Sequence, residues 1–183
     1  MSYHAGQLLL ATPRLVDPNF ARAVIFLLDH DEDGALGVVI NRPSQLSLST
    51  VLPSWGSVVT APSMLFSGGP VAPESALAVG LSLGEGPGEG FKRLTGDVGL
   101  VDLDADPALL LADLVGVRVF SGYAGWGAGQ LESELVEGSW YLAEALPNDL
   151  LDPDPERLWR SVLRRQAGEL AYVATVPDDP SMN

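Results

Sequence analysis

Asp29 and His30 are adjacent residues that could perform acid–base chemistry, because an aspartate can orient a neighbouring imidazole as a general base or a metal ligand. The chain has two histidines, and His4 is the other one, so a multi-histidine metal site is excluded. A histidine at the surface or in a turn is the alternative interpretation.

Arg42 stands between Asn41 and Pro43, directly after an apolar segment. Side chains at strand ends often contact ligands in α/β proteins. A guanidinium can bind a carboxylate or a phosphate through two parallel hydrogen bonds. The alternative is a structural pair with one of the many acidic residues.

The acidic run from Asp29 to Gly34 fits the opening of a calcium-binding EF-hand loop. Such a loop needs a glutamate at its twelfth position, where this chain has Ile40, and its flanks should be helices. Apolar segments at residues 22–29 and 35–40 flank it instead, so the pattern favours a β-hairpin with a solvated turn. We expect no metal and no other cofactor.

Glycine recurs between Gly122 and Gly129, beside Tyr123 and Trp126. A strand, a glycine-rich turn and a helix can bind phosphate, but neither dinucleotide-binding spacing nor a P-loop lysine is present. The stretch therefore predicts a tight strand-to-helix corner with both rings packed over it, and ligand binding by the ring edges is the alternative. No serine fits the nucleophile motif G-x-S-x-G.

These residues need a scaffold of strands with interspersed helices. Strands are predicted at residues 22–29, 35–40, 64–67, 76–79, 98–103, 117–120 and 141–145, and helices at 47–52, 108–115, 130–137 and 156–166. The fold class is therefore α/β or α+β, a single layered domain with a mixed, largely antiparallel β-sheet flanked by helices. The expected domain spans residues 1–176, with a flexible loop near 84–90 and a disordered tail at 177–183.

The net charge is −14, which opposes unaided binding to nucleic acid or to an anionic membrane surface. Cysteine is absent, which excludes disulfides and thiolate chemistry. The amino-terminal residues lack the features of a signal peptide, and no apolar run approaches membrane-spanning length. We therefore expect a cytoplasmic protein.

Four blocks of the sequence together resemble the YqgE/AlgH family, also called UPF0301 or DUF179. They are residues 6–13 with Asp17 and Phe20, residues 24–30 with 34–43, residues 68–71, and residues 122–132 with Trp140 and Leu158-Trp159. The resemblance implies a large mixed sheet flanked by helices and built from two intertwined halves. Members are sometimes described as transcriptional regulators, but no helix-turn-helix or basic surface indicates direct DNA contact here.

Two positions depart from the family pattern. The segment after Gly68-Gly69-Pro70 usually ends in Leu-His, whereas this chain has no histidine there. Asp29-His30 stands where Glu-His is usual. Any mechanism that needs the second histidine is unsupported in this chain.

The first functional hypothesis is a non-enzymatic regulatory or binding protein that acts through a protein partner or a small ligand. The binding surface would use strand ends and turns, namely Asn41, Arg42, Gly68, Gly69, Pro70, Tyr123, Gly125, Trp126, Gly127 and Gln130. The alternative is an enzyme acting on a small anionic metabolite, with Arg42 as the anchor and Asp29 with His30 as the acid–base pair.

Overall fold

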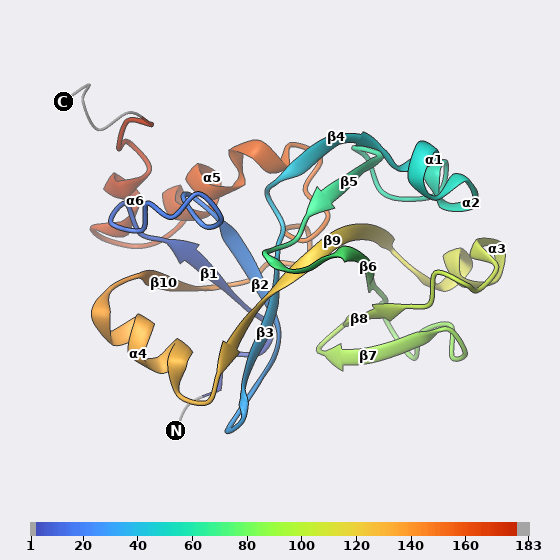
Figure 1. The fold of residues 1–183 in the computed structure, drawn as a ribbon, viewed down its shortest axis with the longest axis horizontal. Coiled ribbons are helices and arrows are strands. Elements are labelled where there is room, and N and C mark those ends of the chain that lie inside the picture. The colour runs from blue at the N-terminus through green and yellow to red at the C-terminus, as the bar shows by residue number, and fades with distance from the viewer. Residues whose placement is uncertain (1–2, 179–183) are drawn as a thin grey trace.

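The computed structural model describes residues 3–178 of the chain. Among them, ten strands form one curled sheet (Figure 1). The strands are β1 (Gln7–Ala11), β2 (Val24–Asp31), β3 (Gly34–Val39), β4 (Pro43–Ser47), β5 (Met64–Ser67), β6 (Val71–Leu81), β7 (Phe91–Thr95), β8 (Val98–Val101), β9 (Gly116–Gly127) and β10 (Trp140–Glu144).

The main path of the sheet runs β10-β1-β2-β3-β9-β6-β8-β7, and β4 and β5 lie off this path. All pairings are antiparallel except that of β5 with β9, which is parallel. The predicted mixed, largely antiparallel sheet with flanking helices is therefore confirmed, and the class is α+β.

Strand β9 belongs to both halves of the molecule (Figure 1). Its first part pairs with β6, from Leu81↔Gly116 to Ala76↔Ser121, and its second part pairs with β3, from Gly37↔Ala124 to Gly34↔Gly127. One long strand thus joins the part of the sheet formed by β10, β1, β2 and β3 to the part formed by β6, β8 and β7.

Short helices cover both parts of the sheet. They are α1 (Leu48–Val51), α2 (Pro53–Gly56), α3 (Pro107–Leu110), η1 (Leu111–Asp113), α4 (Gln130–Glu137), η2 (Pro155–Arg157), α5 (Leu158–Arg164) and α6 (Leu170–Val173). The helix predicted at residues 108–115 is shorter than expected, because Leu114 turns to extended backbone and β9 begins at Gly116.

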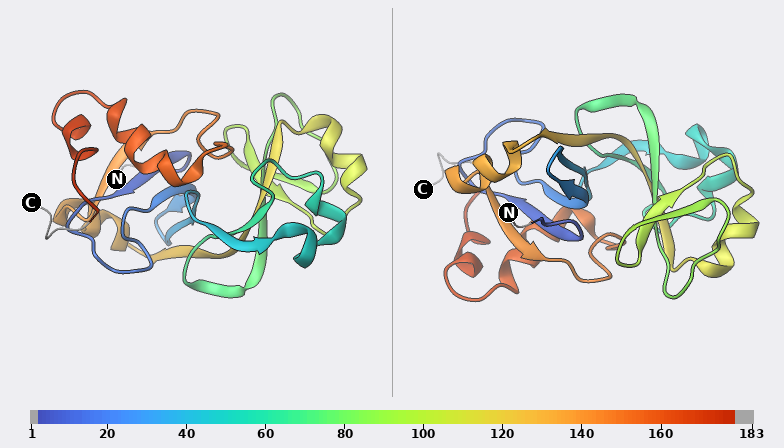
Figure 2. Two further views of the ribbon diagram at one scale, coloured as in Figure 1. Left: turned by 90° about the horizontal axis from the view of Figure 1, so that it is seen from above. Right: turned by 90° about the horizontal axis from the view of Figure 1, so that it is seen from below.

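Alternating side chains place an apolar layer on each face of β1 and β2. Leu8 and Leu10 share a core with Trp159 of α5, whereas Leu9 shares a core with Leu131 of α4. Helices α5 and α4 therefore cover opposite faces of this half. Figure 2 shows them on the two sides of the blue strands β1 and β2. Helices α1 to α3 cover the other half around the buried Trp55.

Candidate functional site

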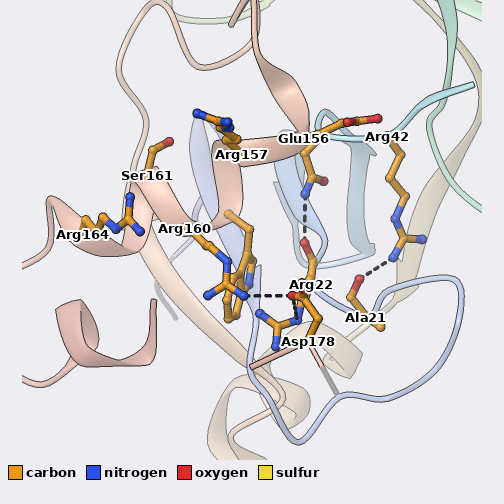
Figure 3. A pocket seen from close by; sticks show the side chains of 11 residues that line it. Ala21, Arg22, Arg42, Glu156, Arg157, Arg160, Ser161, Arg164 and Asp178 are labelled. Atoms are coloured by element: carbon orange, nitrogen blue, oxygen red, sulfur yellow. Dashed lines mark hydrogen bonds and ion pairs between the residues drawn. The ribbon is translucent and has the colours of Figure 1, made fainter. Parts of the chain in front are cut away.

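A cavity of about 570 Å³ lies where the carboxyl end of β3 meets α5 (Figure 3). Five arginines line it, together with Asn41, Trp159 and two carboxylates, Glu156 and Asp178. We call this cavity the arginine pocket, and its arginines are Arg22, Arg42, Arg157, Arg160 and Arg164.

Asn41 fixes the backbone around Arg22, just before β2, at the arginine pocket. The residue is 8% exposed, and its side chain bridges the backbone on either side of Ala23. The amide Nδ2 donates to the carbonyl of Arg22 at 2.9 Å, and Oδ1 accepts from the N–H of Val24 at 2.9 Å. Arg22 has a φ of 56°, a conformation that is uncommon for residues other than glycine. The buried amide thus stabilises a strained backbone that directs Arg22 into the pocket.

Among the residues that the structure describes, Arg42 is fixed by backbone carbonyls and not by a carboxylate. Its Nη1 donates to the carbonyls of Pro18, at 3.0 Å, and Asn19, and its Nη2 donates to the carbonyl of Ala21. Burial lowers the pKa of Arg42 from its ordinary value, and the charge of Asp17 partly opposes this shift. The guanidinium therefore ties the loop to the end of β3 while it lines the cavity.

The other three arginines come from η2 and α5, where residues 157, 160 and 164 have the spacing of one helix face. Arg160 lies 5.7 Å from the ring centre of Trp159, and Arg22 lies 4.5 Å from the same ring. The indole Nε1 of Trp159 donates to the carbonyl of Ala11 at 2.9 Å, which fixes the ring. Two guanidinium groups are thus held by cation–π contact with one buried indole.

Arg22 carries the clearest sign of incomplete pairing. Its Nη1 is buried and has no hydrogen-bond partner among residues 3–178. Burial lowers the pKa of Arg22, the neighbouring Arg160 lowers it further, and Asp178 opposes the shift. A buried donor without an acceptor is unusual in folded proteins, and it belongs to one of the residues that line the arginine pocket.

The other residues of the predicted surface do not line the arginine pocket. Gly68 and Gly69 cross strand β9, and a Cβ at Gly69 would lie 2.2 Å from the backbone of Tyr123. At Gly68 a Cβ would lie 2.3 Å from the carbonyl oxygen of Gly122. Gly68 and Gly69 thus allow close contact between the two backbones, and Pro70 follows them directly. The segment lies near the backbone of Arg42, whose carbonyl accepts from the N–H of Ser67 at 2.8 Å.

The prediction of a glycine-rich turn at residues 122–129 is wrong for most of that stretch. Residues 122–127 are the end of strand β9, and Trp126 is directly opposite Ala35 of β3. The turn is confined to Ala128 and Gly129, whose φ is 73°. Gly122 allows a close contact between backbones, because a Cβ there would lie 2.4 Å from the carbonyl oxygen of Gly69, whereas a Cβ at Gly125 or Gly127 would have no neighbour closer than 3.7 Å.

The far end of β9 holds a separate cluster around Glu134 of α4. The carboxylate accepts from the indole Nε1 of Trp126 and from that of Trp140, each at 2.8 Å. Gln130 donates to the same carboxylate at 3.1 Å and accepts from the N–H of Gly127 at 3.0 Å. Trp126 is therefore an anchor between strand and helix, and Gly125 lies in the strand between Tyr123 and Trp126.

His30 contacts Glu132 of α4 and not Asp29. Its Nδ1 accepts from the backbone N–H of His4 at 3.0 Å, so Nε2 carries the proton and donates to Oε1 of Glu132 at 2.7 Å. Asp29 is exposed, whereas His30 is 5% exposed, because neighbouring residues of a strand face opposite sides. A hydrogen bond from its own backbone, and then the one from His30, lower the pKa of Glu132.

His30 and Arg42 lie at opposite ends of the β2–β3 hairpin. His30 is opposite Ala35, and Arg42 follows seven positions after Ala35. At about 3.3 Å per residue, the two lie roughly 20 Å apart. The structure therefore does not bring the proposed acid–base pair to the proposed anchor.

Sequence reasoning missed Arg22, the arginines of α5, Glu132 and Glu134. The spacing of residues 157, 160 and 164 was a usable signal, because it places three cations on one face. The sequence around Arg22 contained no such signal, because Arg22 stood at the start of the strand predicted at residues 22–29. Within residues 3–178, no group of three or more histidine, aspartate or glutamate side chains is arranged to hold a metal. None of the helices described there is long and apolar enough to cross a membrane.

Comparison with known proteins places the chain in a family. The family model described as AlgH-like, DUF179, matches residues 8–171. A UPF0301 protein of Streptomyces avermitilis is 56% identical over 182 residues, covering 97% of this chain and 94% of that protein. One from Streptomyces coelicolor is 55% identical with the same coverage.

Two solved structures are similar throughout. A crystal structure of a protein from Corynebacterium diphtheriae has a TM-score of 0.89 and 33% identity, covering 96% of this chain and 94% of that one. The solution structure of AlgH from Pseudomonas aeruginosa, a UPF0301 protein, has a TM-score of 0.68 and 32% identity, covering 97% and 96%. The chain therefore belongs to the AlgH-like family, DUF179 or UPF0301, as the sequence blocks predict.

Proposed function

We propose that this protein is a non-enzymatic binding protein with a regulatory role, and that it recognises a compact polyanion at the arginine pocket. The observation that carries the proposal is the distribution of charge. The chain has ten lysines and arginines and a net charge of −14, yet five of those ten residues line one cavity. They face two carboxylates there, which leaves a formal excess of three positive charges.

Gathering like charges is unfavourable unless an opposite charge is supplied. Part of the compensation is internal, because Arg42 is satisfied by backbone carbonyls and Arg22 pairs with Asp178 at 3.4 Å. Arg164 is exposed, and the ion pair of Arg157 with Asp154 spans 3.3 Å between side chains that are 85% and 60% exposed. Exposed pairs of this kind contribute little, so these two arginines remain available to a ligand.

The chemistry of the pocket selects the ligand class. Guanidinium groups bind phosphate and carboxylate oxygens through directed hydrogen bonds, and a cluster of them favours a ligand with several such oxygens. A pocket of about 570 Å³ lies within the usual range for small-molecule sites. A diphosphate or a small polycarboxylate fits these requirements.

The residues that line the cavity favour a binding protein over an enzyme. The lining consists of arginines, two carboxylates, one serine and apolar or amide groups, and His30 lies at the other end of the hairpin. The same polyanionic group could be carried by a free metabolite or by the surface of a protein partner.

The test is calorimetric titration with inorganic pyrophosphate at constant ionic strength, comparing wild type with Arg164→Gln and Lys92→Gln. Lys92 lies in β7 and is exposed, so its variant has the same change in net charge outside the pocket. A hydrogen bond to a charged group contributes about 1.5–3 kcal/mol, so Arg164→Gln should weaken binding by about tenfold or more. Lys92→Gln should stay within about twofold.

The proposal would be refuted if pyrophosphate bound neither the wild type nor Asp178→Asn, a variant that lacks one of the two carboxylates of the pocket. Equal weakening by Arg164→Gln and Lys92→Gln would also refute it, because general electrostatic attraction would then explain the affinity.

A further inference from the structure

The segment from Val176 to Asp178 lies across the arginine pocket. Oδ1 of Asp178 accepts from Nη2 of Arg160 at 2.9 Å and lies 3.4 Å from Nε of Arg22 (Figure 3). The backbone follows the same path, because the carbonyl of Val176 accepts from Arg160 at 3.0 Å and from Arg22 at 3.2 Å. The carbonyl of Pro177 also accepts from Arg22. A chain segment thus supplies the acceptors that these two arginines use.

The two sides of this contact differ in how firmly they are held. The side chains of Arg22 and Arg160 are 28% and 29% exposed, whereas that of Asp178 is 82% exposed. The arginines are fixed against Trp159, but the carboxylate faces water. An ion pair with so exposed a partner contributes little stability, so the carboxylate is replaceable while the cations stay in place.

The internal acceptors do not satisfy the site completely. Nη1 of Arg22 is buried and lacks an acceptor within residues 3–178. Asp178 offers one carboxylate, and its Oδ1 is the atom shared by both arginines. A ligand with more oxygens than a single carboxylate would supply acceptors that Asp178 does not.

We propose that the segment from Val176 to Asp178, which follows the buried Ala174, is an internal competitor of the ligand. In this proposal Asp178 occupies the position between Arg22 and Arg160 that an anionic group of the ligand takes, and binding of the polyanion displaces the segment. The inference rests on the proposed function, since it assigns the regulation of the same pocket. The observed affinity would then be the intrinsic affinity reduced by the fraction of molecules in which the segment is displaced.

The first test compares the pyrophosphate affinity of wild type, Asp178→Asn and Asp104→Asn. Asp104 is exposed and lies in the half of the molecule that carries α3, so its variant changes net charge equally without touching the segment. Removing a weak competitor should tighten binding by about two- to fivefold in Asp178→Asn. Asp104→Asn should differ from wild type by less than about 1.5-fold.

The second test is hydrogen exchange of the segment at saturating pyrophosphate. The N–H of Thr175 donates to the carbonyl of Tyr172 at 3.0 Å, and that of Val176 donates to Val173 at 3.1 Å. Displacement should raise the exchange rate of the Val176 amide several-fold in the wild type, whereas the amide of Thr175, next to the buried Ala174, serves as the reference. Chloride at equal ionic strength should not change either rate.

The outcomes separate the two proposals. If pyrophosphate binds none of the three proteins, the proposed function fails, and the competitor role fails with it. If all three bind equally and exchange of the segment is unchanged or slower, the pocket binds anions but the segment is no competitor. Binding by Asp178→Asn alone would support both proposals, because the segment would then block the pocket in the wild type.

Discussion

Replacing Glu134 by alanine should destabilise the protein far more than its place on a short surface helix suggests. Its carboxylate is the acceptor for the indole N–H groups of Trp126 and Trp140, which are 7% and 5% exposed. Each hydrogen bond to a charged acceptor contributes about 1.5–3 kcal/mol, and a buried donor left unpaired costs about 1–3 kcal/mol. Because the two bonds share one acceptor and do not add simply, we expect a loss of about 2–4 kcal/mol.

The assay is urea denaturation of wild type, Glu134→Ala and Glu137→Ala, followed by tryptophan fluorescence and by far-ultraviolet circular dichroism. Glu137 is exposed in the last turn of the same helix, so its variant should change the free energy of unfolding by less than about 0.5 kcal/mol. For a chain of this size, the melting temperature of Glu134→Ala should fall by about 4–16 °C. Equal stability of the two variants would show that the carboxylate does not satisfy the indoles.

Two further predictions concern Glu132 of α4 and Gly69, which lies against β9. The pKa of Glu132 is lowered in the folded state, so its contribution to stability is full above its unfolded pKa, near 4.5, and is lost as the pH falls through the folded value. Thermal melts at pH 7 should therefore give Glu132→Gln a lower melting temperature than wild type. This difference in melting temperature should shrink below about pH 4.5. A difference that is the same at pH 7 and at pH 3 would contradict the pairing with His30. Gly69→Ala should lose about 2–4 kcal/mol in denaturant titration, because its Cβ would lie 2.2 Å from the backbone of Tyr123 at a φ of 151°. Gly129→Ala, with a φ of 73° and no atom within 4 Å of the new Cβ, should lose only about 1–2 kcal/mol, and equal losses in the two alanine variants would rule out the clash.

Local patterns predicted the elements whose partners are close in sequence. The hairpin of β2 and β3 followed from two apolar segments on either side of an acidic turn, and Gly138 ends α4 with a φ of 81°, as a left-handed cap should. Strand β7 was missed because Lys92 and Arg93 are exposed and the strand has no apolar alternation. Its pairing with β8 is what makes it a strand.

The glycines near Trp126 were misassigned because density of glycine has two physical causes. Glycine permits a turn, and it also lets two backbones come into contact within a sheet. The second cause operates at Gly122, where a Cβ would lie 2.4 Å from the carbonyl oxygen of Gly69. Only the position of Gly69, more than fifty residues earlier, distinguishes the two cases.

The candidate site was predictable only in part. Arg42 and Asn41 were selected for their place at a strand end, and both line the arginine pocket. Arg22 enters the pocket through a backbone conformation imposed by the side chain of Asn41, which no local pattern contains. The arginines of α5 join them because that helix packs on β1 and β2, a consequence of the whole core.

The position of β1 between β2 and β10 has a consequence for synthesis of the chain. One edge of β1 can pair as soon as β2 is made, but the other is paired with β10, where Gln7 is opposite Glu144. Until residues 140–144 leave the ribosome, the apolar strand β1 has one edge of unpaired backbone N–H and C=O groups, and such an edge promotes association between chains. Contacts so distant in sequence also slow folding. A nascent chain that stalls before β10 is therefore the form of this protein most in need of chaperone protection.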